Sequence, residues 1–360
     1  MKPAENKKVA ENLFSSALES FIIFLPEAGP CSSHLKMHCP GSNDIQERTI
    51  MAEKDMTEKA LEAFNDVFAD IINNLLFHGR KRIPEDELEQ GKERSIYQGE
   101  KSLREQERDT SKYWRKNNIR IAYIGLENET EAEDDMPLRI IGYDGAAYRD
   151  QIAYEKDKNG RRKKLPDRYP VVTLVLYFGY KKHWDKARTL HEAIGAHMDN
   201  DFLPFVNDYK INLFEIAWLT DEQVSGFQSD FGIVADYFVQ MRKTGTYNGS
   251  VKDVRHMREV LQLLSALTDD SRFLETAAPA EGGDEPKNMS EVLDRIENRG
   301  REQGIKQGEL NNAKKVAFRL NRKGLPIEDI ADVVETDINT VSSWLQSMSE
   351  DTAARNSNSV

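Results

Sequence analysis

Acidic side chains follow directly after one apolar segment of the sequence. Glu127 comes next after the run at residues 119–126, and Glu129 lies two residues further on. Residues two apart in an extended chain point to the same side, so the two carboxylates share one face if the strand continues. Mg²⁺ binds in proteins to one or two carboxylates together with water and substrate phosphate. With Asp109, these acids can form a divalent-metal site that hydrolyses phosphate esters.

The same acids also fit an ordinary surface loop. A run of like charges is usually a solvated surface. The spacing alone therefore leaves two interpretations open, a metal site and an acidic loop. The acidic run consists of Glu127, Glu129, Glu131, Glu133, Asp134 and Asp135.

A second group of ligand types lies near the N-terminus, at Cys31, His34, His38 and Cys39. Four ligands within nine residues, two of them adjacent, leave poor room for a tetrahedral zinc site, so we do not expect one. The chain has 2 cysteines, both before residue 40, and therefore no disulfide framework beyond that point. This usage agrees with a reducing compartment.

Two apolar runs of strand length position the acids, at residues 119–126 and 171–178. Neither alternates cleanly, which predicts central strands that are covered on both faces. Residues 136–154 between them favour a helix with Pro137 in its first turn, and residues 214–219 are a third strand candidate. This order of elements predicts an α/β sheet.

Helical patterns flank the predicted sheet. Residues 57–77 have apolar side chains at helical spacing, and so do residues 221–242 and 251–268. The charged segment at residues 103–116, which contains Asp109, also has helical propensity. Ser290 is the expected N-cap of a charged C-terminal helix.

The length of 360 residues exceeds the usual single-domain range, so we expect one α/β body with helical additions. The expected parts are an N-terminal extension that is disordered or precedes the true start at Met51 (1–50), the main domain (55–272), a linker (273–289), a charged helical arm (290–323), a small unit (324–348) and a disordered tail (349–360).

The charge balance limits the possible partners. A formal net charge of -12 argues against coating nucleic acid by bulk electrostatics, so any DNA contact must be local. Basic clusters occur at residues 80–82, 161–164 and 181–188, although such clusters are often only solvated surfaces. No apolar run approaches the roughly 18 residues that span a bilayer, so we expect a cytoplasmic protein without a membrane partner.

Four stretches of the chain are, in order, NDVFADIINNLLFHG, LREQERDTSKYW, IAYIGLENETEAEDDMPLRIIGYDGAAYRDQ and YPVVTLVLYFG. They resemble the recombination-promoting nuclease family, a transposase family of the PD-(D/E)XK superfamily of bacterial restriction-like nucleases. The similarity covers about residues 57–195. The segments GREQGIKQGEL and GLPIEDIADVVETDINTVSSWL are also similar to the C-terminal arms of this family.

The resemblance implies a restriction-endonuclease-like core and a metal-dependent DNA endonuclease with a role in DNA recombination. Asp109 then matches the metal-binding aspartate and Glu127 the acid of the (D/E)XK element, so both would bind Mg²⁺ or Mn²⁺. Asp66 matches a further acidic position in the catalytic set. The superfamily places the aspartate on a strand, whereas the local sequence around Asp109 favours a helix.

Glu129 stands where the superfamily has a lysine that orients or activates water, and where relatives in this family usually have glutamine. A carboxylate cannot donate a hydrogen bond unless it is protonated. Either Glu129 is a further catalytic ligand or base, or the enzyme is weakened. The second outcome would leave a binding protein of the same fold that recognises DNA or a protein.

Candidate DNA contacts are Arg139, Lys181 and Lys182. Arg139 shares its predicted helix with Tyr143 and Gln151, and these side chains can contact phosphate and order the site. They can equally pack the helix on the sheet with polar tips in solvent.

The small C-terminal unit resembles a helix-turn-helix, but residues 324–346 contain five carboxylates and no lysine or arginine, which disfavours a transcription regulator. Glu335 stands where such a turn usually has glycine. We expect a docking or homo-oligomerisation role for this unit and the arm. Gly300, Gly304 and Gly308 share one face of the helix, which either allows a second helix to approach or weakens the helix into a flexible arm. A basic stretch at residues 314–323 keeps a DNA-facing arm open. The expected core positions are Ile327, Ile330, Ala331, Val334, Val341 and Leu345.

Overall fold

The computed structural model describes most of the chain from residue 60 onward. These residues belong to the second of two units into which the chain divides, Ile50–Val360. The proposed N-terminal extension, with the ligand types at residues 31–39, lies outside the described residues, as do residues 278–284 of the linker. The described ranges are 60–91, 94–98, 103–107, 109–152, 154–156, 158–164, 168–277 and 285–357.

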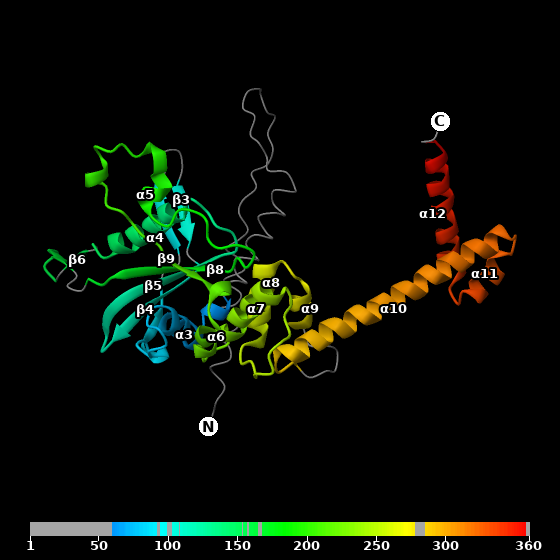
Figure 1. The fold of residues 1–360 in the computed structure, drawn as a ribbon, viewed down its shortest axis with the longest axis horizontal. Coiled ribbons are helices and arrows are strands. Elements are labelled where there is room, and N and C mark those ends of the chain that lie inside the picture. Colours follow the sequence, from blue (N-terminus) through cyan, green and yellow to red (C-terminus); the bar gives the residue numbers. More distant parts are fainter. Residues whose placement is uncertain are drawn as a thin grey trace. The chain divides into compact units, whose positions relative to one another are not determined.

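A five-stranded mixed sheet forms the centre of this unit. Its strand order is β1-β4-β5-β8-β9, with antiparallel pairing among the first three strands and parallel pairing among the last three. Helices cover both faces, which confirms the predicted α/β class (Figure 1). The strands are β1 (Leu88–Gln90), β4 (Thr110–Lys116), β5 (Ile119–Glu129), β8 (Val171–Tyr177) and β9 (Asn212–Glu215).

The two apolar runs are central strands, as the sequence predicts. β8 nearly coincides with its run, whereas β5 continues past residue 126 to Glu129. The two strands are parallel, with Glu127 paired to Val175 and Glu129 paired to Tyr177. The acids that follow the apolar run are therefore part of the strand itself.

One face of the sheet packs in the main hydrophobic core. Ala122, Ile124 and Leu126 of β5 point to this side, because they occupy alternate positions of the strand. Trp114 of β4 joins them in the same cluster. Helices that contribute to this core include α3 (Asn65–Leu75), α7 (Phe231–Thr244) and α8 (Met257–Thr268).

The other face of the sheet is covered by α4 (Met136–Asp150), close to the predicted bounds and with Pro137 in the first turn. Ile140 of α4 belongs to one buried cluster with Val175 and Tyr177 of β8. Glu127 and Glu129 point to this face, because they alternate with Leu126. Figure 1 shows α4 and α3 on opposite sides of the sheet.

The charged segment at residues 103–116 is extended, so the prediction of a helix was wrong. It forms β3 (Leu103–Glu107) and β4, and β4 buries Trp114 on one face and Tyr113 on the other. Differences in helix propensity are at most about 0.7 kcal/mol for ordinary residues, so burial of large side chains outweighs them. Asn117 and Asn118 both have positive φ, as a two-residue hairpin turn requires, and return the chain into β5.

Several predicted boundaries move. The first helix begins at Asn65 after a break at residues 63–64, although residues 60–62 are also helical. The strand expected at residues 214–219 is β9, which ends at Glu215, and Ile216–Trp218 form the 3-10 helix η5. The helix expected at residues 251–268 is α8, which begins at Met257.

The helix expected at residues 221–242 is two helices, α6 (Asp221–Gly226) and α7. Thr220 starts α6 with a capping box that includes Gln223. The chain then turns at residues 227–230 before α7 begins. Short capped helices of this kind have too few residues to show a helical period of their own.

Smaller elements complete the described structure. None of its helices is both long enough and apolar enough to cross a membrane. The remaining elements are the paired strands β2 (Arg94–Gln98) with β3 and β6 (Tyr154–Lys156) with β7 (Arg162–Lys164), the helices α5 (Leu190–Ile194) and α9 (Arg272–Ala277), and the 3-10 helices η2 (Glu85–Glu87), η3 (Gly195–His197) and η4 (Leu203–Phe205).

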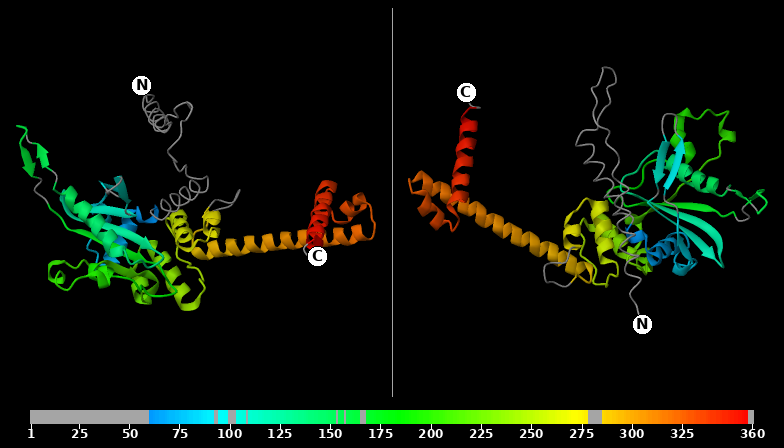
Figure 2. Two further views of the ribbon diagram at one scale, coloured as in Figure 1. Left: turned by 90° about the horizontal axis from the view of Figure 1, so that it is seen from above. Right: turned by 180° about the vertical axis from the view of Figure 1, so that it is seen from behind.

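The C-terminal arm is one continuous helix, α10 (Met289–Arg322), which Figure 2 shows from two further sides. Its N-cap is Asn288 and not Ser290, because the Asn288 side chain accepts a hydrogen bond of 3.0 Å from the backbone of Glu291. The glycines at 300, 304 and 308 have no described atom within 4 Å of where a Cβ would stand.

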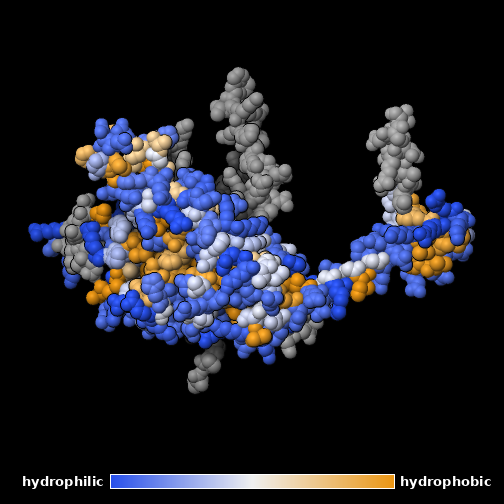
Figure 3. All heavy atoms as spheres, in the orientation of Figure 1, coloured by the Kyte–Doolittle hydropathy of each residue, from blue (hydrophilic) through white to orange (hydrophobic). Residues whose placement is uncertain are grey.

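A small cluster joins the end of α10 to α11 (Ile327–Val333) and α12 (Ile338–Ser357). All the expected core positions belong to this cluster, together with Trp344 and Ala317. Glu335 has a φ of 51°, the backbone conformation for which glycine is usual. Hydrophobic side chains gather on this unit at the right of Figure 3.

Candidate functional site

Two adjacent strands bring Asp109 and Glu127 together. Asp109 immediately precedes β4. The first residue of β4, Thr110, pairs with Leu126 in the antiparallel register, so Asp109 lies next to Glu127 of β5. The backbone N–H of Asn128 donates a hydrogen bond of 2.7 Å to Oδ2 of Asp109. Both carboxylates therefore lie on the α4 side of the sheet, near the end where β5 and β8 finish.

Glu127 is a buried carboxylate, with 1% of its side chain exposed. Burial of a charge is costly unless a partner compensates it. That partner is Arg139 on α4, whose Nη2 lies 3.2 Å from Oε2 of Glu127. Tyr143, one helical turn after Arg139, is buried on the same face of α4.

Arg139 connects three glutamates. Its Nη1 donates to Oε1 of Glu129 at 2.8 Å and to Oε2 of Glu133 at 3.2 Å, in addition to the contact with Glu127. Glu129 is mostly covered and Glu133 is about half exposed, on the loop between β5 and α4. The acidic run is therefore not a simple solvated loop, because two of its members are buried around one arginine.

The protonation states of the site follow from this burial. Burial raises the pKa of Glu129 to about 7, although the neighbouring Arg139 pulls in the opposite direction. Burial also opposes the charge on Arg139, but the carboxylates of Glu129 and Glu127 raise the pKa of its guanidinium above the usual range. Burial and the charge of Glu127 raise the pKa of Tyr143, which keeps its hydroxyl protonated.

The other acidic residue expected in the site, Asp66, lies on α3, which packs on the opposite face of the sheet. Its Oδ2 is 3.5 Å from Nε2 of His256 and 3.7 Å from Nη1 of Arg255. The structure thus places Asp66 in an ion-paired cluster with the segment before α8. Nothing in these contacts joins it to the pair of Asp109 and Glu127.

Gln151 has a structural role at the end of α4. Its side chain donates to the carbonyl of Tyr169 at 3.1 Å and accepts from the N–H of the same residue at 3.0 Å. These two bonds hold the chain just before β8. Of the three polar residues predicted on this helix, Arg139 and Tyr143 lie beside the acids and Gln151 does not.

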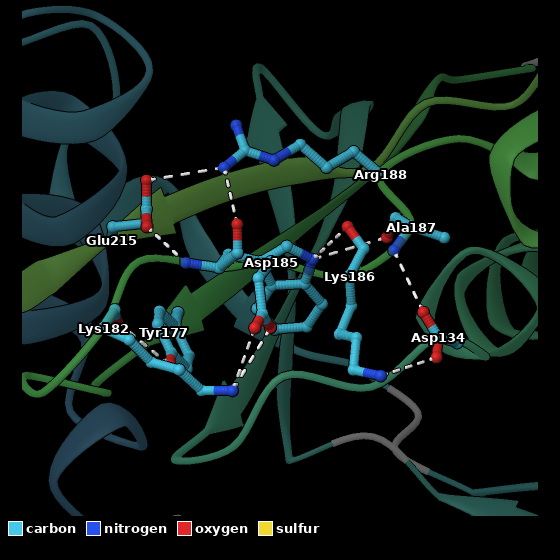
Figure 4. A network of polar contacts seen from close by, with 9 residues as sticks. Asp134, Tyr177, Lys182, Asp185, Lys186, Ala187, Arg188 and Glu215 are labelled. Carbon is cyan, nitrogen blue, oxygen red and sulfur yellow. Dashed lines mark hydrogen bonds and ion pairs between the residues drawn. The ribbon is translucent and has the colours of Figure 1, made fainter.

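The basic segment at residues 181–188 is mostly neutralised by acids, as Figure 4 shows. Lys182 pairs with Asp185 at 3.1 Å, and Lys186 pairs with Asp134 at 2.8 Å. Asp134 is the neighbour of Glu133, so the Lys186 contact ties the basic segment to the loop that leads from β5 to α4. Lys181 is exposed and forms no ion pair with the part of the chain that the structure describes.

A pocket of about 460 Å³ opens beyond the ends of β5 and β8. In sheets with parallel strands, ligands bind beside the carboxyl ends of these strands. Lys181 and Lys182 line one part of the pocket, residues 130–132 line another, and Phe238 of α7 and Leu267 of α8 line the side toward the main core. The two predicted DNA-contact lysines follow β8 in the chain and thus lie near the end of β5, which carries the glutamates.

Sequence reasoning missed the role of Glu133 and Asp134. Both belong to the acidic run: Glu133 pairs with Arg139 of α4, and the only signal for the pairing of Asp134 was the basic segment about 50 residues later. The structure shows that this segment and the acidic loop contact each other through Lys186 and Asp134.

Asp109 and Glu127 are carboxylates, the ligand type that a divalent ion prefers, and they lie on neighbouring strands. Among the described residues, no group of three or more His, Cys, Asp and Glu side chains is arranged to hold a metal ion. Asp109 and Glu127 supply the one or two protein carboxylates that Mg²⁺ needs when water and substrate phosphate complete its shell. The guanidinium of Arg139 beside Glu127 adds a positive charge at the same place.

Comparison with known proteins gives no relative: no family model, no curated protein and no solved structure matches the chain.

Proposed function

We propose that the chain is a metal-dependent DNA endonuclease with a restriction-endonuclease-like core. Asp109 and Glu127 would hold Mg²⁺ or Mn²⁺, and the reaction would be hydrolysis of a DNA phosphodiester bond. The observation that carries the proposal is the hydrogen bond of 2.7 Å between Asn128 and Asp109, which seats the two acids on neighbouring strands. In this arrangement two carboxylates that are separated in the sequence lie next to each other.

The strand at Asp109 also supports the proposal. The resemblance requires an aspartate on a strand and an acid on the next one, whereas helix propensity had suggested otherwise. In the fold, β4 begins at the residue after Asp109, and Glu127 lies within β5. Asp109 therefore adjoins a strand and not a helix, which supports the resemblance.

The chemistry divides between the ion and the protein. A bound divalent ion supplies Lewis-acid chemistry, which polarises a phosphate and makes water more acidic. Glu127 is held in place by Arg139 and Asp109 by the backbone of Asn128, so neither carboxylate needs to reorganise when substrate binds. DNA contact through a few local cations, such as Lys181, agrees with the net charge of -12.

The alternative is a binding protein of the same fold that has lost catalysis. One observation favours it: an arginine contacts Glu127 directly, and Glu129 replaces the usual residue of the motif. Such a protein would bind DNA or another protein without cleaving DNA. The long exposed helix α10 is a candidate for self-association in either case.

The experiment is cleavage of supercoiled plasmid by the full chain with Mg²⁺ or Mn²⁺. We expect nicking that stops with EDTA and in Glu127→Ala. Asp66→Asn is the matched control, because it removes a carboxylate on the opposite layer of the fold. No cleavage by a folded, unaltered chain with either metal would contradict the proposal and support the binding-protein alternative.

A further inference from the structure

Because Glu129 occupies the lysine position of the motif, strand β5 carries no positive side chain there. Arg139 of α4 supplies a positive charge at this place instead. Its Nη2 donates to Glu127 at 3.2 Å and its Nη1 donates to Glu129 at 2.8 Å. The guanidinium group is planar, so two contacts from different nitrogens fix both its position and its orientation. Glu129, which stands where the motif has lysine, is thus not itself a cation but binds the guanidinium of Arg139.

Arg139 is partly exposed, whereas the two strand glutamates that it contacts are covered. Its side chain is 36% exposed, whereas that of Glu127 is 1% and that of Glu129 is 13% exposed. The two glutamates therefore hold the guanidinium from within the protein. A ligand in solvent can reach the exposed part of Arg139.

The contact of Arg139 with Glu133 is replaceable. Glu133 is 52% exposed and 3.2 Å from Nη1, on the loop before α4. An ion pair with this much solvent exposure contributes little to stability. Another anion that reaches Arg139 can therefore displace Glu133 at little cost.

We infer that Arg139 is the substrate-binding cation of this site: Glu129 holds it beside Glu127, and it binds a phosphate oxygen of the DNA backbone in place of Glu133. This inference rests on the proposed function, because it assigns the substrate contact of the same site. Arginine forms charge-assisted hydrogen bonds with phosphate that are about twice as strong as neutral ones. Glu129 is then a positioning residue that acts through Arg139, and not a base or a metal ligand.

The charge of the whole site has to be controlled in the test. Arg139→Gln alone leaves Glu127 and Glu129 without their counter-charge, so any loss would have two explanations. The double variant Glu129→Gln/Arg139→Gln removes one negative and one positive charge and keeps the net charge of the site. Arg139→Lys keeps the cation but loses the planar group.

The first measurement is binding of a short DNA duplex to the full chain in EDTA, over a range of salt concentrations. We expect the double variant to bind about tenfold more weakly, and the slope of log affinity against log salt to fall by about one unit. Glu133→Gln should bind more tightly than the unaltered chain, because the competing carboxylate is gone. Equal affinity and equal slope for the unaltered chain and the double variant would overturn the inference, and so would failure of the unaltered chain to bind the duplex.

The second measurement moves the cation back to the strand. Glu129→Lys/Arg139→Gln places an ammonium group near the position that the guanidinium leaves. We expect it to recover a large part of the duplex binding and of the plasmid cleavage that Glu129→Gln/Arg139→Gln loses. Recovery of the melting temperature without recovery of binding would show that Arg139 is only structural.

The two proposals fail in different ways. Absence of metal-dependent cleavage by the unaltered chain contradicts the nuclease, while the binding measurement still decides the role of Arg139. Cleavage that is lost in Glu127→Ala but kept at full rate in Glu129→Gln/Arg139→Gln supports the nuclease and overturns the role of Arg139.

Discussion

Nη1 of Arg139, on helix α4, lies 2.8 Å from Oε1 of Glu129, on strand β5 of the sheet that α4 covers. The ion pair is mostly covered on the glutamate side, so water solvates the carboxylate poorly. Its charge therefore depends on Arg139 for compensation. This relationship links the stability of the metal-free site to pH.

Ionisation of Glu129 should destabilise the metal-free protein. In the folded protein the pKa of about 7 is above the usual value of 4.5, so the unfolded chain ionises first as pH rises. Stability then falls between about pH 4.5 and pH 7, by on the order of 2–3 kcal/mol. Glu129→Gln should lose this part of the pH dependence, as thermal unfolding in EDTA would measure. Parallel melting curves of both proteins through this window would contradict the prediction.

The protein should be more stable with leucine in place of Asn128. Its side chain is buried with 9% exposed, and neither side-chain polar atom has a hydrogen-bond partner in the described part of the chain. It alternates onto the core face of β5 with Leu126. Asn128→Leu should raise the melting temperature by a few degrees, because a buried unsatisfied group costs about 1–3 kcal/mol. Asn128→Asp should lower it, and the opposite order of the two variants would show that the asparagine is satisfied in solution.

Lys181 should contribute to DNA affinity through a phosphate contact. It is exposed, lines the pocket beyond β5 and β8, and has no ion pair among the described residues. Lys181→Ala should weaken duplex binding several-fold and reduce the salt slope by about one unit. Lys252→Ala is the matched control, because Lys252 is also exposed but does not line this pocket. A similar loss in both variants would point to general charge and not to a contact.

Trp344 should hold the C-terminal unit together. It is 9% exposed and belongs to the small cluster with Ile330 and Val341. Truncation of a buried tryptophan costs about 3–5 kcal/mol, which is more than a cluster of this size can lose. Trp344→Ala should raise hydrogen exchange in α11 and α12 and leave β5 and β8 protected. Retained protection in α11 would mean that other contacts stabilise the unit.

The sequence predicts the parts of the fold whose signals are local. β5 and β8 are continuous apolar runs because both of their faces are covered, and α4 has its proline in the first turn. β4 carries no such signal, since it buries Lys112, whose Nζ donates to the carbonyl of Ala63 at 2.6 Å. Because the hydrogen-bond partner of Lys112 lies far away in sequence, a prediction from the local sequence assigns this lysine to the surface.

The candidate site was predictable in its acids but not in its pairing. Asp109 and Glu127 follow from the spacing and the resemblance, and β4 and β5 bring them together. The contacts of Arg139 depend on how α4 lies on the sheet, which no local pattern specifies. The position of Asp66 away from the other acids was not predictable either, because its partners Arg255 and His256 lie far along the chain.

The central claim is that Asp109 and Glu127 act as one metal-binding pair in DNA cleavage. The most direct test is the rate of plasmid nicking by Asp109→Asn, Glu127→Gln and the double variant, each over a range of Mn²⁺ concentrations. If both carboxylates hold one ion, either single variant loses activity by at least about 100-fold and the double variant loses little more. Losses that multiply in the double variant, or an unchanged dependence on Mn²⁺ in the single variants, would contradict the claim.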